Sequence, residues 1–214
     1  MKTFFKSFVI LMLSLSAFLP YSIVSAGSSK ATVVNLRGPT VNAVFSDTDS
    51  TGCIYTEVFV TASGGTDQEL PSQGTPIRIG AVNIYKYDAC TDTTLINASG
   101  FNDSLPAGDF QISKQLDWAS LHTTLNLTDI NTNESFAVNV NVNWTGTSDI
   151  TRNHENTNDI YYRGCHVLNR WKGSGRTANA SGTVSDGVTN FTPSASQYAD
   201  INLVIDGFEV IGCQ

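Results

Sequence analysis

The clearest pattern in the chain is a strict alternation of apolar and polar residues over positions 135–145. Apolar residues occupy every second position from Phe136 to Trp144, and asparagines fill three of the positions between them. Successive side chains of a β-strand point to opposite faces, so a period of two is typical of a strand with one face in the core and one in water. We therefore expect a strand here, with Trp144 packed in the core.

A similar alternation precedes this stretch. Leu121, Leu125 and Leu127 are separated by polar residues, and the polar segment 129–133 lies between the two stretches. Two alternating runs that are joined by a short polar segment predict an antiparallel hairpin.

The other ordered stretches are rich in Thr, Val, Ile, Tyr and Phe and are bounded by Gly, Asn, Asp, Ser and Pro, as is typical of strands and turns. No amphipathic helix of normal length is indicated. Residues 53–62 are apolar on both faces, which predicts a central strand that is covered on both sides. We expect strands at 32–36, 41–46, 53–62, 77–87, 110–116, 165–172, 178–184 and 201–211, and longer loops at 63–76 and 147–162.

Many strands at short spacing, with no helices between them, predict an all-β fold built from antiparallel sheets. The arrangement that we expect is an antiparallel two-sheet β-sandwich. A closed β-barrel or a jelly roll is the alternative.

The N-terminus has the three parts of a secretory signal peptide. Lys2 and Lys6 supply the positive charge, residues 8–19 are almost entirely apolar, and small residues precede a cleavage point after Ala26. The apolar run is shorter than the ~20 residues that span a bilayer. We expect residues 1–26 to be removed, leaving one secreted domain, 27–214, that is extracellular or periplasmic and has no membrane insertion.

The charge of the chain restricts its partners. The formal net charge is −7, and because residues 1–26 carry two lysines and no acid, the remainder carries −9. An acidic surface repels phosphate backbones and anionic lipids, which disfavours nucleic-acid binding. The partners that we expect are carbohydrate or another extracellular protein.

Four cysteines, all beyond the signal peptide, are far apart in the chain. Zinc sites usually use closely spaced pairs, whereas an even number of cysteines in an exported protein favours disulfides. If the strands at 53–62 and 77–87 pair, Cys53 lies near Cys90, and neighbouring strands at 165–172 and 201–211 bring Cys165 near Cys213. We therefore expect a disulfide-stapled fold with these two bonds.

No signature of a known catalytic site is present in the sequence, and the three histidines are scattered. A triad assembled from distant residues is one enzyme hypothesis, and a carboxylate pair for glycoside hydrolysis is a better one. Glu57 is the most interesting acid, because burial in its apolar strand would raise its pKa. The simpler interpretation is that Glu57 pairs with a nearby arginine or points out at a strand edge.

Residues 47–52 resemble the start of a calcium-binding loop. Asp47 and Asp49 occupy its first and third positions and Gly52 its sixth, but Val58 stands where a bidentate acid is needed. A hairpin turn explains the same residues, since Asp and Gly favour turns. We expect no cofactor, with Ca²⁺ bound by Asp47 and Asp49 as the alternative.

Exposed aromatic and basic residues are the candidates for ligand binding. Aromatic rings stack on sugar rings, and a basic patch on an acidic protein suits an anionic sugar or an acidic partner, although such patches also form ion pairs across strands. Trp118 is a further aromatic candidate. The candidate binding residues are Tyr161, Tyr162, Arg170, Trp171, Lys172 and Arg176.

Seven Asn-x-Ser/Thr sequons are present, a modest excess over the number that this composition gives by chance. They begin at Asn97, Asn102, Asn126, Asn133, Asn143, Asn179 and Asn190.

Three functions are compatible with these features. We expect a secreted, non-catalytic binding or structural module rather than an enzyme. The first alternative is a secreted hydrolase, with glycoside hydrolysis ahead of acyl transfer. The second is a subunit of an extracellular assembly, in which a neighbour completes an open sheet edge.

Overall fold

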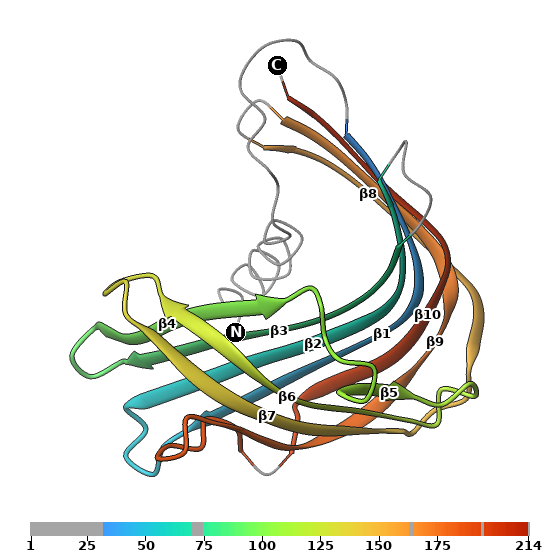
Figure 1. The fold of residues 1–214 in the computed structure, drawn as a ribbon. Coiled ribbons are helices and arrows are strands. Elements are labelled where there is room, and N and C mark those ends of the chain that lie inside the picture. The colour runs from blue at the N-terminus through green and yellow to red at the C-terminus, as the bar shows by residue number, and fades with distance from the viewer. Residues whose placement is uncertain (1–31, 70–74, 163–164, 194, 214) are drawn as a thin grey trace. The chain divides into compact units, whose positions relative to one another are not determined.

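The computed structural model describes residues 32–69, 75–162, 165–193 and 195–213 (Figure 1). These residues form strands and no α-helix, so no helix among them is long and apolar enough to cross a membrane. The predicted signal peptide, 1–26, lies outside the described residues.

Ten strands follow one another along the described chain. They are β1 (Thr32–Thr48), β2 (Ile54–Glu69), β3 (Thr75–Asp88), β4 (Thr93–Asn102), β5 (Phe110–Ile112), β6 (Trp118–Asp129), β7 (Ser135–Gly146), β8 (Thr151–Tyr162), β9 (Cys165–Ser185) and β10 (Tyr198–Cys213).

All ten strands belong to one sheet, and every pairing between them is antiparallel. The order is β10-β1-β2-β3-β4-β6-β7-β9-β8, with β5 beside β6 and an additional pairing between β10 and β9. Figure 1 shows the long strands β1, β2, β3, β9 and β10 as strongly bent ribbons. The all-β, antiparallel prediction is therefore confirmed.

The strand predictions differ from the structure in several regions. The predicted loop 63–76 is wrong at both ends, because β2 runs to Glu69 and β3 begins at Thr75, and the strand predicted at 110–116 is shortened to β5. β1 and β9 each continue through two predicted strands.

β4 was not predicted, because its sequence has no clear alternation and buries only Ala98 fully. The predicted loop 147–162 is wrong over most of its length, because β8 occupies Thr151–Tyr162 and pairs with β9. Polar residues dominate β8, so its strand conformation follows from backbone pairing rather than from an apolar face.

Apolar residues of nine strands, most of them at alternating positions, build the core. Trp144 of β7 is 1% exposed, which confirms that it packs in the core, and its indole Nε1 donates to the carbonyl oxygen of Asn42 on β1 at 2.8 Å. The largest fully buried side chains are Trp144, Phe45, Ile84, Leu121, Leu125, Leu127, Ile201, Val41, Val58, Val60, Val82 and Val138.

The predicted hairpin is the β6–β7 pair, and a buried carboxylate holds its turn. Asp129 Oδ1 accepts from the backbone N–H of Asn131 at 2.8 Å and of Thr132 at 3.2 Å. Its Oδ2 accepts from the N–H of Asn97 on β4 at 3.1 Å. Burial alone would raise the pKa of Asp129, but these three N–H donors lower it overall.

A disulfide joins Cys53 to Cys90, as predicted, with the Cα atoms 5.2 Å apart. Such a bond is typical of an oxidising compartment outside the cytosol. Cys165 and Cys213 lie opposite each other in the β9–β10 register, but their side chains lie outside the described part. The second disulfide stays a prediction.

Candidate functional site

The turn between β1 and β2 is held by the carboxylate of Asp49. Its Oδ1 accepts from the backbone N–H of Ile54 at 3.0 Å and of Cys53 at 3.1 Å, and the Thr51 hydroxyl donates to it at 2.8 Å. These bonds, led by the one from Ile54, lower the pKa of Asp49. Gly52 has a φ of +76°, a conformation that favours glycine. The predicted hairpin turn is therefore present.

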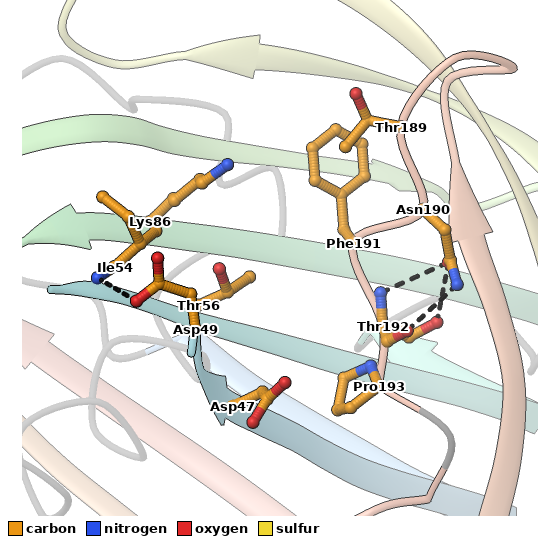
Figure 2. A pocket seen from close by; sticks show the side chains of 10 residues that line it. All are labelled: Asp47, Asp49, Ile54, Thr56, Lys86, Thr189, Asn190, Phe191, Thr192 and Pro193. Carbon is orange, nitrogen blue, oxygen red and sulfur yellow. Dashed lines mark hydrogen bonds between the residues drawn. The ribbon is translucent and has the colours of Figure 1, made fainter. Parts of the chain in front are cut away.

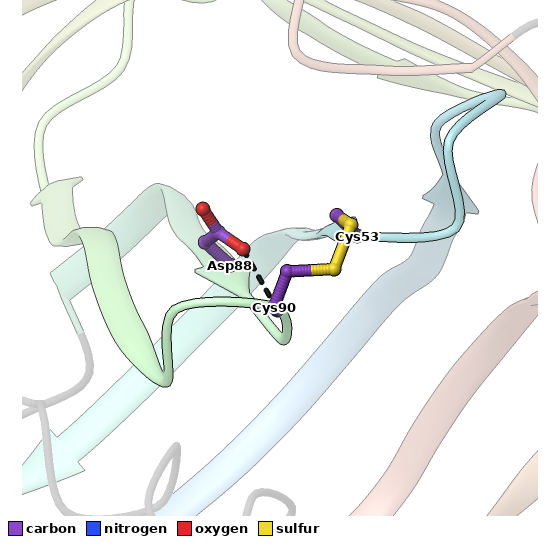
Figure 3. Close-up of side chains that lie close together, drawn as sticks. All are labelled: Cys53, Asp88 and Cys90. Carbon is purple, nitrogen blue, oxygen red and sulfur yellow. Dashed lines mark hydrogen bonds between the residues drawn. A yellow bond between two sulfur atoms is a disulfide. The ribbon is translucent and has the colours of Figure 1, made fainter.

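The turn between β3 and β4 lies next to it and has a similar cap. Asp88 Oδ1 accepts from the backbone N–H of Cys90 at 2.8 Å and of Thr91 at 3.1 Å. Figure 3 shows Asp88 beside the disulfide that joins this turn to Cys53. The three residues have the spacing of a metal site, but the two sulfurs are bonded to each other and offer no thiolate. We interpret Cys53, Asp88 and Cys90 as a clamp, in which the disulfide joins the β1–β2 turn to the β3–β4 turn.

A cleft of about 220 Å³ opens beside these turns. Asp47 of β1, Thr56 of β2 and Lys86 of β3 stand opposite one another in the sheet register. They form the next row beyond the buried Val58 on the core side of the sheet, so the core ends in a polar row. The cleft is lined by Asp47, Asp49, Ile54, Thr56, Lys86, Thr189, Asn190, Phe191, Thr192 and Pro193.

The opposite wall of the cleft is the segment 189–193, between β9 and β10. Phe191 is 6% exposed, and its ring lies 6.4 Å from that of Phe136. The buried Thr192 hydroxyl donates to the Gly182 carbonyl at 3.0 Å and accepts from the Val184 N–H at 3.2 Å. These contacts fix the wall to β7 and β9.

The chemistry of the cleft comes from two carboxylates, one ammonium group, one amide and several hydroxyl groups. In Figure 2, Asp47, Thr56 and Lys86 extend from the sheet on one side, and the Thr189–Pro193 segment faces them. A carboxylate accepts hydrogen bonds, an ammonium donates them, and a threonine hydroxyl does both. This set complements a small ligand that carries hydroxyl groups.

Both residues of the predicted calcium site line this cleft. Asp49 already accepts three hydrogen bonds on Oδ1 within its own turn, whereas Asp47 accepts only the Thr48 N–H among the described residues, at 2.9 Å. The calcium site stays a prediction, and Asp47 is its more accessible ligand.

The predicted binding residues of β8 and β9 do not line the cleft. Arg176 forms an ion pair with Asp117, with Nη1 and Oδ1 2.6 Å apart, and its Nε donates to the Ser148 carbonyl at 2.7 Å. Lys172 is exposed, and the register places it between Glu155 of β8 and Asp206 of β10.

For the other predicted binding residues, the structure describes the backbone but not the side chain. They are Tyr161 and Tyr162 in β8 and Arg170 and Trp171 in β9. Trp118 is 46% exposed at the start of β6.

Glu57 points to the face of β2 opposite the core-facing Val58. Its Oε2 accepts from the Tyr55 hydroxyl at 2.6 Å, so its partner is a tyrosine rather than an arginine. No sequence pattern indicates Thr56, Lys86 or the 189–193 segment as part of a site, because only the strand register and the β9–β10 connection bring them together.

Comparison with known proteins found no family model, no curated protein and no solved structure that matches this chain.

Proposed function

We propose that this protein is a non-catalytic, extracytoplasmic binding module that recognises carbohydrate through the cleft beside the β1–β2 turn. The observation that carries the proposal is the polar row of Asp47, Thr56 and Lys86 at the open end of the core. Typical sites for drug-sized ligands have roughly 300–1,000 Å³. The smaller cleft here suits a single sugar ring, with Asp47 and Lys86 bonding its hydroxyl groups.

Binding fits the cleft better than glycoside hydrolysis does. Hydrolysis needs one carboxyl group that keeps its proton near neutral pH and a second that stays ionised. Asp49 has a lowered pKa and is engaged in the turn, so it is a poor proton donor. The acids of the cleft therefore support recognition of hydroxyl groups.

A glycan array, followed by calorimetry on the sugars it identifies, tests this proposal. We expect Asp47→Asn and Lys86→Met to weaken binding at least tenfold, because each removes a charged hydrogen-bonding group. Asp109→Asn and Lys114→Met are matched controls outside the cleft and leave binding unchanged. Equal affinities of the cleft variants and the wild type would contradict the proposal. Loss of array binding in a chelator would support Ca²⁺ at Asp47 and Asp49.

We also propose that this one sheet, which the β10–β9 pairing closes into a ring, is flattened into two facing layers, with β1, β2, β3 and β10 opposite β6 and β7. Two observations support this. Trp144 of β7 reaches the backbone of β1, at Asn42, across the core. In addition, β4 and β6 are joined by only two residue pairs, Ala98–Asp129 and Ser99–Thr128, which suits a boundary between layers.

A role as an assembly subunit is the second candidate function, and β8 favours it. Among the described strands, β8 pairs with β9 alone, so its other edge carries backbone groups that a neighbouring strand can bind. Analytical ultracentrifugation tests this: a concentration-dependent oligomer supports assembly, and a monomer throughout contradicts it.

A further inference from the structure

Three tyrosines form a strip on the face of β2 and β3 that points away from the core. Tyr55 and Tyr87 stand opposite each other in the β2–β3 register, and Tyr85 lies two residues from Tyr87 on the same face. The rings of Tyr85 and Tyr87 are 6.3 Å apart between centroids and only 11° from parallel. We call Tyr55, Tyr85 and Tyr87 the tyrosine strip; all three are partly exposed.

Carboxylates hold two of these rings in place. The Tyr55 hydroxyl donates to Glu57 Oε2 at 2.6 Å, and the Tyr87 hydroxyl donates to Asp92 Oδ1. Burial first, and then the bond to Glu57, raises the pKa of Tyr55, while the bond to Asp92 is the main cause of the raised pKa of Tyr87. Both phenols stay neutral, and each carboxylate keeps a second oxygen that can accept a hydrogen bond.

We propose that the tyrosine strip is a second ligand surface, which binds a neutral glycan chain. Partly exposed aromatic rings on one face present electron-rich surfaces against which the C–H faces of sugar rings can stack. Glu57 and Asp92 lie beside the rings and accept hydrogen bonds from sugar hydroxyl groups. The same carboxylates repel sugars that carry carboxylate or sulfate groups, which is why the ligand is neutral.

The tyrosine strip is distinct from the cleft. Along β2, Tyr55 alternates with Thr56, and along β3, Tyr85 and Tyr87 flank Lys86, so the two sites lie on opposite faces of the same strands. One sugar ring in the cleft and a longer chain on the strip are therefore separate binding events, and the strip does not depend on the cleft.

Affinity electrophoresis of the full secreted protein through gels that contain soluble polysaccharides tests the proposal. The probes are neutral β-glucan, α-glucan and mannan, with polygalacturonate as the anionic comparison. We expect at least one neutral probe to retard the protein and polygalacturonate to leave it unretarded. Tyr85→Ala and Tyr87→Ala weaken retardation at least tenfold. Tyr87→Phe keeps the ring, so it weakens retardation less than Tyr87→Ala does.

Matched variants separate binding from stability and from the cleft. Trp118→Ala removes an aromatic side chain that is 46% exposed elsewhere and leaves retardation unchanged. Asp109→Asn and Lys114→Met, which lie outside the cleft and the tyrosine strip, also leave it unchanged, and circular dichroism confirms that every variant is folded. Asp47→Asn and Lys86→Met are measured beside them to separate the strip from the cleft. The proposal is overturned if no neutral probe retards the wild type, if folded Tyr85→Ala is retarded normally, or if only the cleft variants lose retardation.

Discussion

Two faces of the sheet that point away from the core differ sharply in chemistry. On β2 and β3, tyrosine rings are fixed by carboxylates, and β10 adds a similar pair in which the Tyr198 hydroxyl donates to Asp200 at 2.5 Å. On β6, β7 and β9, the corresponding positions form rows of small polar residues, such as His122–Asn141–Thr183 and Ser120–Asn143–Ser181. We call the second surface the neutral face, because its outward positions on β6, on β7 and on residues 178–185 of β9, the part that pairs with β7, carry no Asp, Glu, Lys or Arg.

The difference shows that the same alternation of buried and exposed residues can produce outer surfaces with different chemistry. Side chains of the neutral face make few bonds with each other; Thr124 donates to Asn139 at 2.9 Å, and the Thr128 and Ser135 hydroxyls are 3.0 Å apart. Short polar side chains in water contribute solubility and little directional chemistry. The tyrosine rings and carboxylates at the ends of β2 and β3 near the disulfide supply the groups to which the proposed glycan would bind.

The largest predicted effect tests how strongly the two sides of β7 differ. Trp144→Ala should lower the free energy of unfolding by about 3–5 kcal/mol, because it leaves a cavity in the core and removes the bond to Asn42. Its neighbour on the neutral face, Asn143, is exposed, so Asn143→Ala should change stability by less than about 0.5 kcal/mol. Urea denaturation under non-reducing conditions measures both. A cost above about 1 kcal/mol for Asn143→Ala would show that the neutral face is structural.

The second prediction concerns the clamp beside the tyrosine strip. The Cys53–Cys90 bond closes a loop with a sequence separation of 37, so removing both cysteines as Ser should cost about 3–4 kcal/mol. We also expect weaker binding in the cleft, because the clamp fixes the turn that carries Asp49. Denaturation and calorimetry of the double variant measure the two effects, with Asp88→Asn as the control that loosens only the β3–β4 turn cap. Unchanged stability would contradict the role of the clamp.

The third prediction concerns Asp129, which holds the β6–β7 turn beside the neutral face without a covalent bond. Its pKa is lower in the folded protein than in the unfolded chain, so its contribution is complete above about pH 4 and is lost as the pH falls through the folded value. Asp129→Asn should cost about 1 kcal/mol at pH 7 and reduce the loss of stability between about pH 5 and pH 2. Unfolding curves over that range, recorded for both proteins, test this; parallel pH profiles would refute it.

The neutral face also explains how far the sequence predicts this fold. Periodicity correctly identified β6 and β7, because their buried and exposed residues alternate without interruption. When an exposed Asn and an exposed Ser or Thr lie on either side of one buried residue, the strand alternation itself produces the sequence Asn-x-Ser/Thr. Asn126, Asn143 and Asn179 are examples. Part of the sequon excess is thus a consequence of strand geometry. β4 and β8 lack such alternation, so only tertiary pairing reveals them.

The candidate sites were less predictable than the fold. Asp47 and Asp49 are adjacent in the chain to a recognisable turn, and the sequence alone placed them together. Lys86 and Thr56 join them only through the β1–β2–β3 register, and the 189–193 segment joins through the β9–β10 connection. The tyrosine strip needs the same register to bring Tyr55 beside Tyr87. Residues that meet across strands leave no local motif.

The smallest predicted effect tests whether the neutral face has a binding role of its own. Asn141 lies at the middle of the His122–Asn141–Thr183 row and is exposed, so Asn141→Lys should change stability by less than about 0.5 kcal/mol. A charge there should leave both retardation by neutral polysaccharides and the sedimentation coefficient unchanged, because the tyrosine strip and the β8 edge lie on other strands. If Asn141→Lys instead abolishes retardation or dissociates an oligomer, the uncharged surface is itself a contact surface. The comparison would then reverse, because the absence of charge would mark the face that binds.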